Sequence, residues 1–255
     1  MRILAIGDIV GECGVKKVKE ILPNLKKSEN IDFVIANGEN SAEGMGITSE
    51  IFKELLRAGV DVVTMGNHTW GKKEIFCFID HKQLIRPANY PEGVVGNGYG
   101  IYEVNGKKIA VINLIGRVDM NVLSENPFLT AEKIINNIKN ESDIIIIDFH
   151  AEATAEKIAM GYYLGGNATI IFGTHTHVQT ADARILDNGT AYITDIGMTG
   201  PAKSVIGMDV DASVKRFVTS LPEKYKIADS AAMFNGCIFN VGEDDKVKDI
   251  RTIRM

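Results

Sequence analysis

The chain has 255 residues and a mass of 27.9 kDa, enough for one large α/β domain or two small ones with a substantial core. Its composition, 45% hydrophobic and 24% charged, is that of a soluble globular protein, and a net charge of −5 argues against an extended nucleic-acid-binding face. We find no signal peptide, no apolar run near ~20 residues and no disulfide framework among three cysteines. We therefore expect a cytoplasmic protein without a membrane segment.

Six apolar runs in the first two-thirds of the chain predict buried strands, because a strand covered on both faces is continuously hydrophobic. They lie at 3–6, 33–36, 61–66, 109–115, 143–149 and 168–173. Helices are expected between them, at 15–25, after Thr48 or Ser49 as N-cap, at 70–79, from near Thr130, and at 152–163. We expect Pro23 to kink or end the first helix. This alternation is typical of an α/β fold with parallel strands.

Two parts of the chain depart from this alternation. Residues 81–100 contain Pro87, Pro91 and four glycines and are expected to form a long irregular connection, which is often functional. After about residue 182, short strands separated by turn residues predict antiparallel pairing, and they lie at 183–186, 190–194, 236–241 and 247–253. Segment 197–225 is expected to carry one helix. Without repeats or linkers, we expect a single domain over residues 1–255.

Polar residues of metal-ligand type follow five of the apolar runs. They are Asp8, then Glu39 and Asn40, then Asn67 and His68, then His150, and finally His175 and His177. Because α/β enzymes bind ligands at the carboxyl ends of parallel strands, these groups should converge at one edge of the sheet. A ligand set of Asp, Glu, Asn and His without Cys suits Fe, Mn or Zn.

This set predicts a two-metal hydrolytic site, in which two ions about 3.5–4 Å apart share a carboxylate and a bridging hydroxide. Glu39, near the middle of the set, is the best candidate for the shared carboxylate. His175 and His177 leave two arrangements open. In an extended segment both would point to one side; in a turn beyond the strand each could serve a different metal.

The same residues resemble the blocks of the calcineurin-like metallophosphoesterases, in the same order. These blocks read Gly7-Asp8, Gly38-Glu39-Asn40, Gly66-Asn67-His68, His150 and Gly173-Thr174-His175-Thr176-His177. Further stretches at 86–91, 150–154, 175–181 and 193–201 look like the bacterial YmdB-type branch, and this resemblance covers essentially the whole chain. It implies an αββα sandwich with mixed sheets, a dinuclear centre that usually contains iron, and phosphodiesterase activity on 2′,3′-cyclic nucleotides.

The resemblance also implies roles for individual residues. One metal would be held by Asp8, Glu39, Asn40 and His177, and the other by Glu39, Asn67, His150 and His175. A metal-bridging hydroxide would attack the phosphorus, and His68 would protonate the leaving ribose oxygen.

The chain departs from the wider superfamily in three places. Val10 stands where the usual D-x-H opening has its histidine, Glu39 where most relatives have Asp, and Thr174 separates the last glycine from the first histidine. The YmdB-type branch shares all three departures.

Several residues have more than one interpretation. Asp8 alone could be a turn acid, and His68 could be a ligand or position the substrate. Arg117 could contact phosphate or pair with Asp119, and Asn89 could line the pocket. Asp195 and Thr199 could orient a ligand histidine, whereas Asp148 and Glu152 could be helix-cap or surface acids. Trp70 and Tyr90 could stack on a base or pack in the core. His81 is expected to be a surface histidine.

Two other function classes stay open beside the phosphodiesterase. One is a regulatory metal- and nucleotide-binding protein with little turnover, and the other is a metal-dependent amidohydrolase. His68 beside a full ligand set favours hydrolysis of a small phosphodiester. A homo-oligomer is compatible with the sequence.

Overall fold

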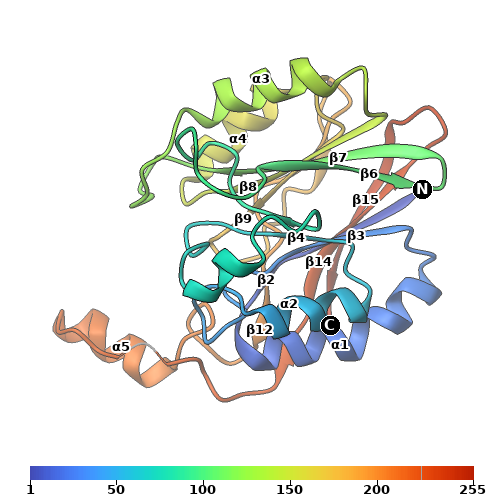
Figure 1. The fold of residues 1–255 in the computed structure, drawn as a ribbon. Helices are drawn as coiled ribbons and strands as arrows, with labels where there is room; N and C mark the ends of the chain where they lie inside the picture. Colours follow the sequence, from blue (N-terminus) through green and yellow to red (C-terminus); the bar gives the residue numbers. More distant parts are fainter. Residues whose placement is uncertain (225) are drawn as a thin grey trace.

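The computed structural model describes residues 1–224 and 226–255. Two six-stranded sheets face each other, with helices on the outer face of each (Figure 1). This is the αββα sandwich that the resemblance implies, and the α/β class is confirmed. The last residue of the 197–225 segment lies outside the described residues, and the single-domain organisation stays a prediction.

The first sheet has the strand order β15-β14-β1-β3-β4-β5. Its strands are β1 (Arg2–Ile6), β3 (Phe33–Asn37), β4 (Val62–Thr64), β5 (Leu84–Ile85), β14 (Asn235–Val241) and β15 (Val247–Arg254). The first four are parallel to one another, and the last two form the predicted antiparallel pair at one edge. The outer face is covered by α1 (Gly11–Ser28) and α2 (Ser49–Ala58).

The second sheet has the order β10-β11-β9-β8-β7-β6. Its strands are β6 (Tyr99–Val104), β7 (Lys107–Ile115), β8 (Ile144–His150), β9 (Ile170–Thr174), β10 (Arg184–Ile185) and β11 (Ala191–Ile193). Its outer face packs against α3 (Pro127–Ile138) and α4 (Thr154–Tyr163). Strands β7, β8, β9 and β11 are parallel, and β10 is antiparallel to β11.

Successive side chains along a strand point to opposite faces of the sheet and pack into two separate apolar layers. In β1, Ile3 and Ala5 pack between the two sheets, whereas Leu4 and Ile6 pack against the helices of the first sheet. This is the period of two that a pleated strand imposes. The inter-sheet layer fixes how the two sheets face each other, and therefore how their strand ends meet.

A small third sheet of β2 (Asp8–Ile9), β12 (Met198–Pro201) and β13 (Ala232–Met233) joins the start of the chain to the 197–225 segment. Asp8 pairs with Met198 in parallel register. Beyond β12 the segment carries α5 (Val210–Thr219), the one predicted helix, which projects from the body (Figure 1).

Local predictions had mixed outcomes. Thr48 is the N-cap of α2 and accepts a hydrogen bond from the Ile51 amide at 3.2 Å. Pro23 was expected to kink or end the first helix. It does not end it, because α1 continues to Ser28, and the kink stays a prediction. Pro23 lies on the exposed face, where water can reach the carbonyl of Lys19 that loses its partner. The helix predicted at 70–79 is a short 3₁₀ turn, Lys73–Cys77.

Five of the described strands were missed, namely β2, β5, β6, β12 and β13. Strand β6 pairs with β7 across Asn105-Gly106, both with positive φ, and this dipeptide is a strong hairpin signal. Strand β12 lies at the start of the segment for which only a helix was predicted. Among the described residues, no helix is long and apolar enough to cross a membrane, and all three cysteines are unpaired.

Candidate active site

All eight predicted site residues lie at the carboxyl ends of strands, on the side from which α5 projects (Figure 1). Asp8 begins β2, Glu39 and Asn40 follow β3, and Asn67 and His68 follow β4. His150 ends β8, while His175 and His177 follow β9. The site therefore draws on both large sheets, as expected for strand ends that meet at one edge of a sandwich.

Four ligand-type side chains meet around His150. Its Nε2 lies 2.8 Å from Asn67 Oδ1, 3.0 Å from His175 Nδ1 and 3.1 Å from Glu39 Oε1. His150 and Glu39 are fully buried. Glu39, His150 and His175 each offer a ligand atom, and these atoms lie within 4.8 Å of one another, so this group can hold a metal ion.

A second group lies on the other side of Glu39. His177 Nε2 is 3.7 Å from Asp8 Oδ1 and 3.2 Å from Asn40 Nδ2, which in turn lies 3.2 Å from Glu39 Oε1. Asp8 is fully buried, and its Oδ2 accepts a hydrogen bond from the His175 amide at 3.1 Å. The structure thus brings together the residues of the two expected ligand sets, with Glu39 between them, and ligation by these residues stays a prediction.

The outer hydrogen bonds of the three imidazoles leave one nitrogen of each ring facing the centre. His177 Nδ1 donates to the carbonyl of Ile206 at 2.8 Å, which frees Nε2. His175 Nε2 lies 3.1 Å from Glu152 Oε2, which frees Nδ1. His150 Nδ1 lies 2.9 Å from Thr174 Oγ1, whose hydroxyl donates to Asp148 Oδ1 at 2.7 Å. Such outer contacts orient metal-ligating histidines.

Backbone conformation decides between the two arrangements left open for the histidine pair. His175 has φ 96° and His177 φ 66°, so both are in the left-handed region and neither continues the strand. The pair lies in a turn just beyond β9, and each imidazole joins a different ligand group. The extended arrangement is excluded.

Buried charges shift the pKa values at the centre strongly. Burial lowers the pKa of His150, but the Glu39 carboxylate outweighs it and raises this pKa to about 9. Burial and the nearby His150 lower the pKa of His175 to about 3. Burial raises the pKa of Asp8. In the metal-free protein a proton on His150 therefore supplies positive charge that a metal ion would replace.

The chemistry of this donor set fits a bound metal. A single N–H on His150 Nε2 faces three acceptor atoms, and the buried Asp8 Oδ1 has no hydrogen-bond partner among the described residues. Unpaired buried acceptors are costly, and a cation satisfies several at once. Gly66 leaves room for the ligands: a Cβ there would lie 2.5 Å from His150 Nε2 and closer still to Glu39 Oε2.

His68 lies at the rim of this cluster. Its Nδ1 is 2.7 Å from Asn40 Oδ1, its amide donates to Glu39 Oε2 at 2.8 Å, and its side chain is 32% exposed. The amide nitrogen of Asn40, and not its oxygen, faces Glu39 and His177. Ligation through Oδ1 requires a half-turn of this amide, after which Nδ2 would donate to His68 Nδ1 and leave the proton on Nε2.

A cavity of about 450 Å³ opens above the cluster, a size typical of small-ligand sites. Its floor contains Glu39, Asn67, His68 and the histidine pair. One wall is apolar and is formed by Met45, Ile206, Met208 and Ile227. We call these four residues the apolar wall. The 197–225 segment, for which only a helix was predicted, thus borders the site.

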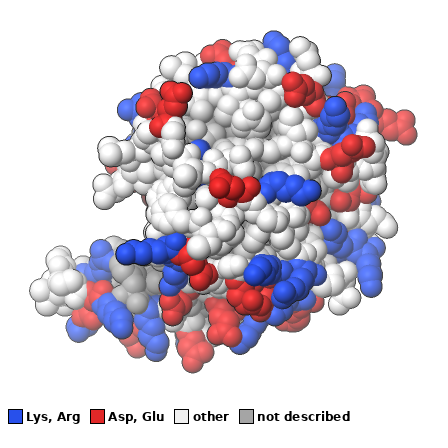
Figure 2. Space-filling view, in the orientation of Figure 1, with Lys and Arg blue, Asp and Glu red and all other residues white. Residues whose placement is uncertain are grey.

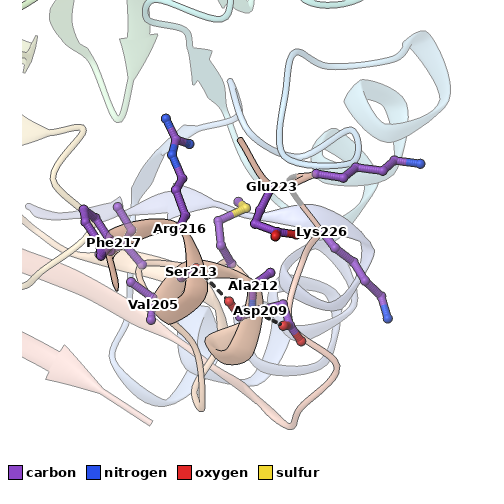
Figure 3. Close-up of a pocket in the computed structure, with 11 residues that line it drawn as sticks. Val205, Asp209, Ala212, Ser213, Arg216, Phe217, Glu223 and Lys226 are labelled. Atoms are coloured by element: carbon purple, nitrogen blue, oxygen red, sulfur yellow. Dashed lines mark hydrogen bonds between the residues drawn. The ribbon is translucent and has the colours of Figure 1, made fainter. Parts of the chain in front are cut away.

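A second cavity, of about 90 Å³, lies beside α5 and is lined by Phe217 and Arg216 among others (Figure 3). It is too small for a nucleotide and contains none of the eight predicted residues. On the face drawn in Figure 2, basic and acidic side chains are interspersed along the lower edge, over α1, α2 and α5. The expected lack of an extended nucleic-acid-binding face stays a prediction.

The secondary candidates divide between supporting and distant roles. Asp195 accepts from Thr176 Oγ1 at 2.7 Å and so supports the histidine turn, whereas Thr199 hydrogen-bonds to the backbone of Asn235. Glu152 contacts His175, and Asp148 is buried behind His150.

Asn89 is buried and bonds the backbone of Ile115 and Glu125, while Arg117 is exposed; neither is among the described residues that line the cavity. Tyr90 packs against Trp70, and His81 lies at the surface as expected. Sequence reasoning missed Asn37, which contacts both Asp148 and His150, and the buried Lys157.

Comparisons with known proteins agree with this geometry. The family model of the YmdB-like protein matches residues 4–253. The chain is 51% identical over 249 residues to the 2′,3′-cyclic-nucleotide 2′-phosphodiesterase of Bacillus subtilis (strain 168), covering 97% of this chain and 93% of that protein.

Two solved structures are similar over the whole chain at 38% identity. One is a novel phosphatase from Mycoplasma pneumoniae, with a TM-score of 0.95 and 93% of that chain covered. The other is a hypothetical protein from Thermus thermophilus, with a TM-score of 0.94 and 99% covered. The predicted enzyme class, a hydrolase of phosphoesters, is confirmed by these relatives. The chain belongs to the YmdB-like family of metallophosphoesterases.

Proposed function

We propose that this protein is a dinuclear metal-dependent phosphodiesterase that hydrolyses cyclic phosphodiesters, 2′,3′-cyclic nucleotides foremost. The observation that carries the proposal is the orientation of the imidazoles of His150, His175 and His177. Each ring turns one nitrogen toward buried oxygen ligands, and a cation that replaced the proton on His150 would complete this arrangement. The substrate follows from the 51% identity to a 2′,3′-cyclic-nucleotide 2′-phosphodiesterase.

Two ligand sets with Glu39 in common hold the ions in this proposal: Asp8, Asn40 and His177 on one side, and Asn67, His150 and His175 on the other. Two Fe, Mn or Zn ions bound there supply an activated water and offset charge on the phosphoryl oxygens. The ligand chemistry is compatible with iron, which the family resemblance favours.

His68 is the proposed general acid. With the Asn40 amide turned for ligation through Oδ1, Nδ2 would donate to His68 Nδ1, and the proton on Nε2 would then be available for the departing ribose oxygen. His68 lines the cavity, which brings it within reach of a substrate above the metals. General acid catalysis contributes roughly 10²- to 10⁴-fold to rate, and this is the part that His68 supplies.

In this proposal the apolar wall binds the nucleoside part of the substrate. Met208 and Ile227 are directly paired by an antiparallel bridge, and the Asp209 amide donates to the carbonyl of Lys226 at 2.8 Å. Their side chains therefore form a preformed apolar surface beside the polar floor. A phosphate on the floor and a base against this wall match the two halves of a cyclic nucleotide.

The test is hydrolysis of 2′,3′-cyclic AMP by protein purified anaerobically, with metal content measured on the same sample. His68→Ala is the test variant, and His81→Ala, an exposed histidine outside the site, is its matched control. We expect two metals per chain in all three proteins and a loss of roughly 10²- to 10⁴-fold in kcat only in His68→Ala.

Two results would redirect the proposal. Two metals without turnover of any cyclic phosphodiester would favour the nucleotide-binding protein over the enzyme. Wild-type protein without bound metal would refute the ligand assignment.

A further inference from the structure

A fully buried lysine lies behind the metal-ligand cluster. Lys157, on α4, is 1% exposed, and its Nζ donates to the carbonyl of Thr174 at 2.7 Å and to Asp195 Oδ2 at 2.8 Å. A buried ammonium group is unfavourable unless it is paired and hydrogen-bonded, and this one has both kinds of partner. Lysines on helices that cover a sheet normally reach solvent, so the burial of Lys157 calls for a structural reason.

The two partners of Lys157 lead directly to the histidine turn. Asp195 Oδ2 also accepts hydrogen bonds from the Thr176 amide at 3.1 Å and from Thr176 Oγ1 at 2.7 Å. Asp195 Oδ1 is held in turn by the Gly197 amide at 2.8 Å. Lys157 and Asp195 thus fix Thr174 and Thr176, the residues that alternate with His175 and His177.

This turn needs external support because both histidines have left-handed backbone angles, φ 96° and φ 66°. Such angles are unfavourable for residues with a Cβ and persist only where surrounding contacts enforce them. If the turn relaxed to negative φ, the two imidazoles would swing away from the groups that they now join. Lys157 and Asp195 hold the backbone at Thr174 and Thr176, and between them the His175 amide donates to Asp8 Oδ2 at 3.1 Å.

We propose that Lys157 is a positioning residue for the metal centre: with Asp195 it holds the left-handed turn that directs His175 to one ligand group and His177 to the other. The inference rests on the proposed metal centre. Lys157 touches neither substrate nor metal, and it acts through the geometry of the turn. Its loss therefore weakens metal binding more than it weakens the rest of the fold.

The experiment measures the affinity of metal-free protein for Mn²⁺ and Zn²⁺ by competition with a chromogenic chelator, together with the thermal midpoint of the metal-free protein. Lys157→Met removes the ammonium group at similar length. Thr176→Val removes one bond to Asp195 without leaving a buried charge unpaired, and so tests the same network if Lys157→Met does not fold. Asp182→Asn is the matched control, because the Asp182 carboxylate bonds Thr180 and Thr194 nearby instead of the histidine turn.

We expect metal affinity to fall about 10- to 100-fold in Lys157→Met and about 10-fold in Thr176→Val, and to be unchanged in Asp182→Asn. A purely structural role would lower the thermal midpoint and leave the affinity of the folded protein intact. Wild-type affinity in Lys157→Met, or in Thr176→Val where the first variant does not fold, overturns the inference. Failure of wild-type protein to bind metal refutes the proposed function as well, so the two failures are distinguishable.

Discussion

Replacing Gly66 with alanine should remove metal from the site without unfolding the protein. The added Cβ would lie 2.5 Å from His150 Nε2 and closer still to Glu39 Oε2, whereas ordinary van der Waals contact begins at 3.4 Å. Both side chains must therefore move by about 1 Å. Metal–ligand distances tolerate only about ±0.2 Å, so the displaced ligands are lost from the centre.

We expect the substitution to lower both the free energy of unfolding and the catalytic efficiency. Overpacking should lower the free energy of unfolding by about 1–3 kcal/mol. The displacement should lower kcat/KM for 2′,3′-cyclic AMP by about 100-fold or more, with less than two metals per chain. The assay combines metal analysis, steady-state hydrolysis and urea unfolding of the metal-free protein.

Gly161→Ala is the matched control, because its Cβ would lie 2.8 Å from the ring of Tyr192 in the core and contacts no ligand. This variant should lose a similar free energy of unfolding and keep both metals. If Gly66→Ala retained two metals and wild-type turnover, Glu39 and His150 would not be the ligands that we infer.

Three further predictions test the wall, the electrostatics and the fold. Met208→Ala and Ile227→Ala should each raise KM for 2′,3′-cyclic AMP about 10-fold and leave KM for glycerol 1,2-cyclic phosphate, which has no base, unchanged; equal effects on both substrates would refute base binding by the wall. The Glu39 carboxylate outweighs the effect of burial and raises the pKa of His150 from 6.5 to about 9. The protonated ring therefore stabilises the metal-free protein fully below about pH 6.5, and this contribution is lost as the pH rises through 9. Urea midpoints of metal-free wild type should therefore fall over that window, and a flat profile would contradict the coupling. Thr48→Ala should cost about 1 kcal/mol in urea unfolding, with metal content unchanged, because it removes the cap on the Ile51 amide.

The strand-end rule predicted which residues come together because it depends on one property of parallel strands, that their carboxyl ends share an edge. The apolar runs before Glu39, Asn67 and His150 are long enough to be recognised, and all three residues meet in the structure. The pairing of β2 with β12 was beyond this reasoning, because a two-residue strand has no periodicity to detect.

Other features depend on contacts that no local pattern records. The choice between two arrangements of His175 and His177 is set by backbone φ in a turn that Lys157, Asp195 and Asp8 contact from distant parts of the chain. In the sequence Lys157 looks like a surface lysine, because it is buried only through the packing of α4 over the turn after β9. By contrast, the β6–β7 hairpin was predictable from Asn105-Gly106 and was overlooked.

The division of the ligands between the two large sheets gives a bound metal a mechanical role. Asp8, Glu39 and Asn67 belong to the half of the sandwich that begins the chain, whereas His150 and His177 belong to the other half. A metal bound as proposed would therefore connect the two large sheets at this edge. Chelation would remove this connection. Backbone amides at the carboxyl ends of β3, β4, β8 and β9 should then exchange hydrogen faster, while amides at the opposite edge of the sandwich should exchange as slowly as before.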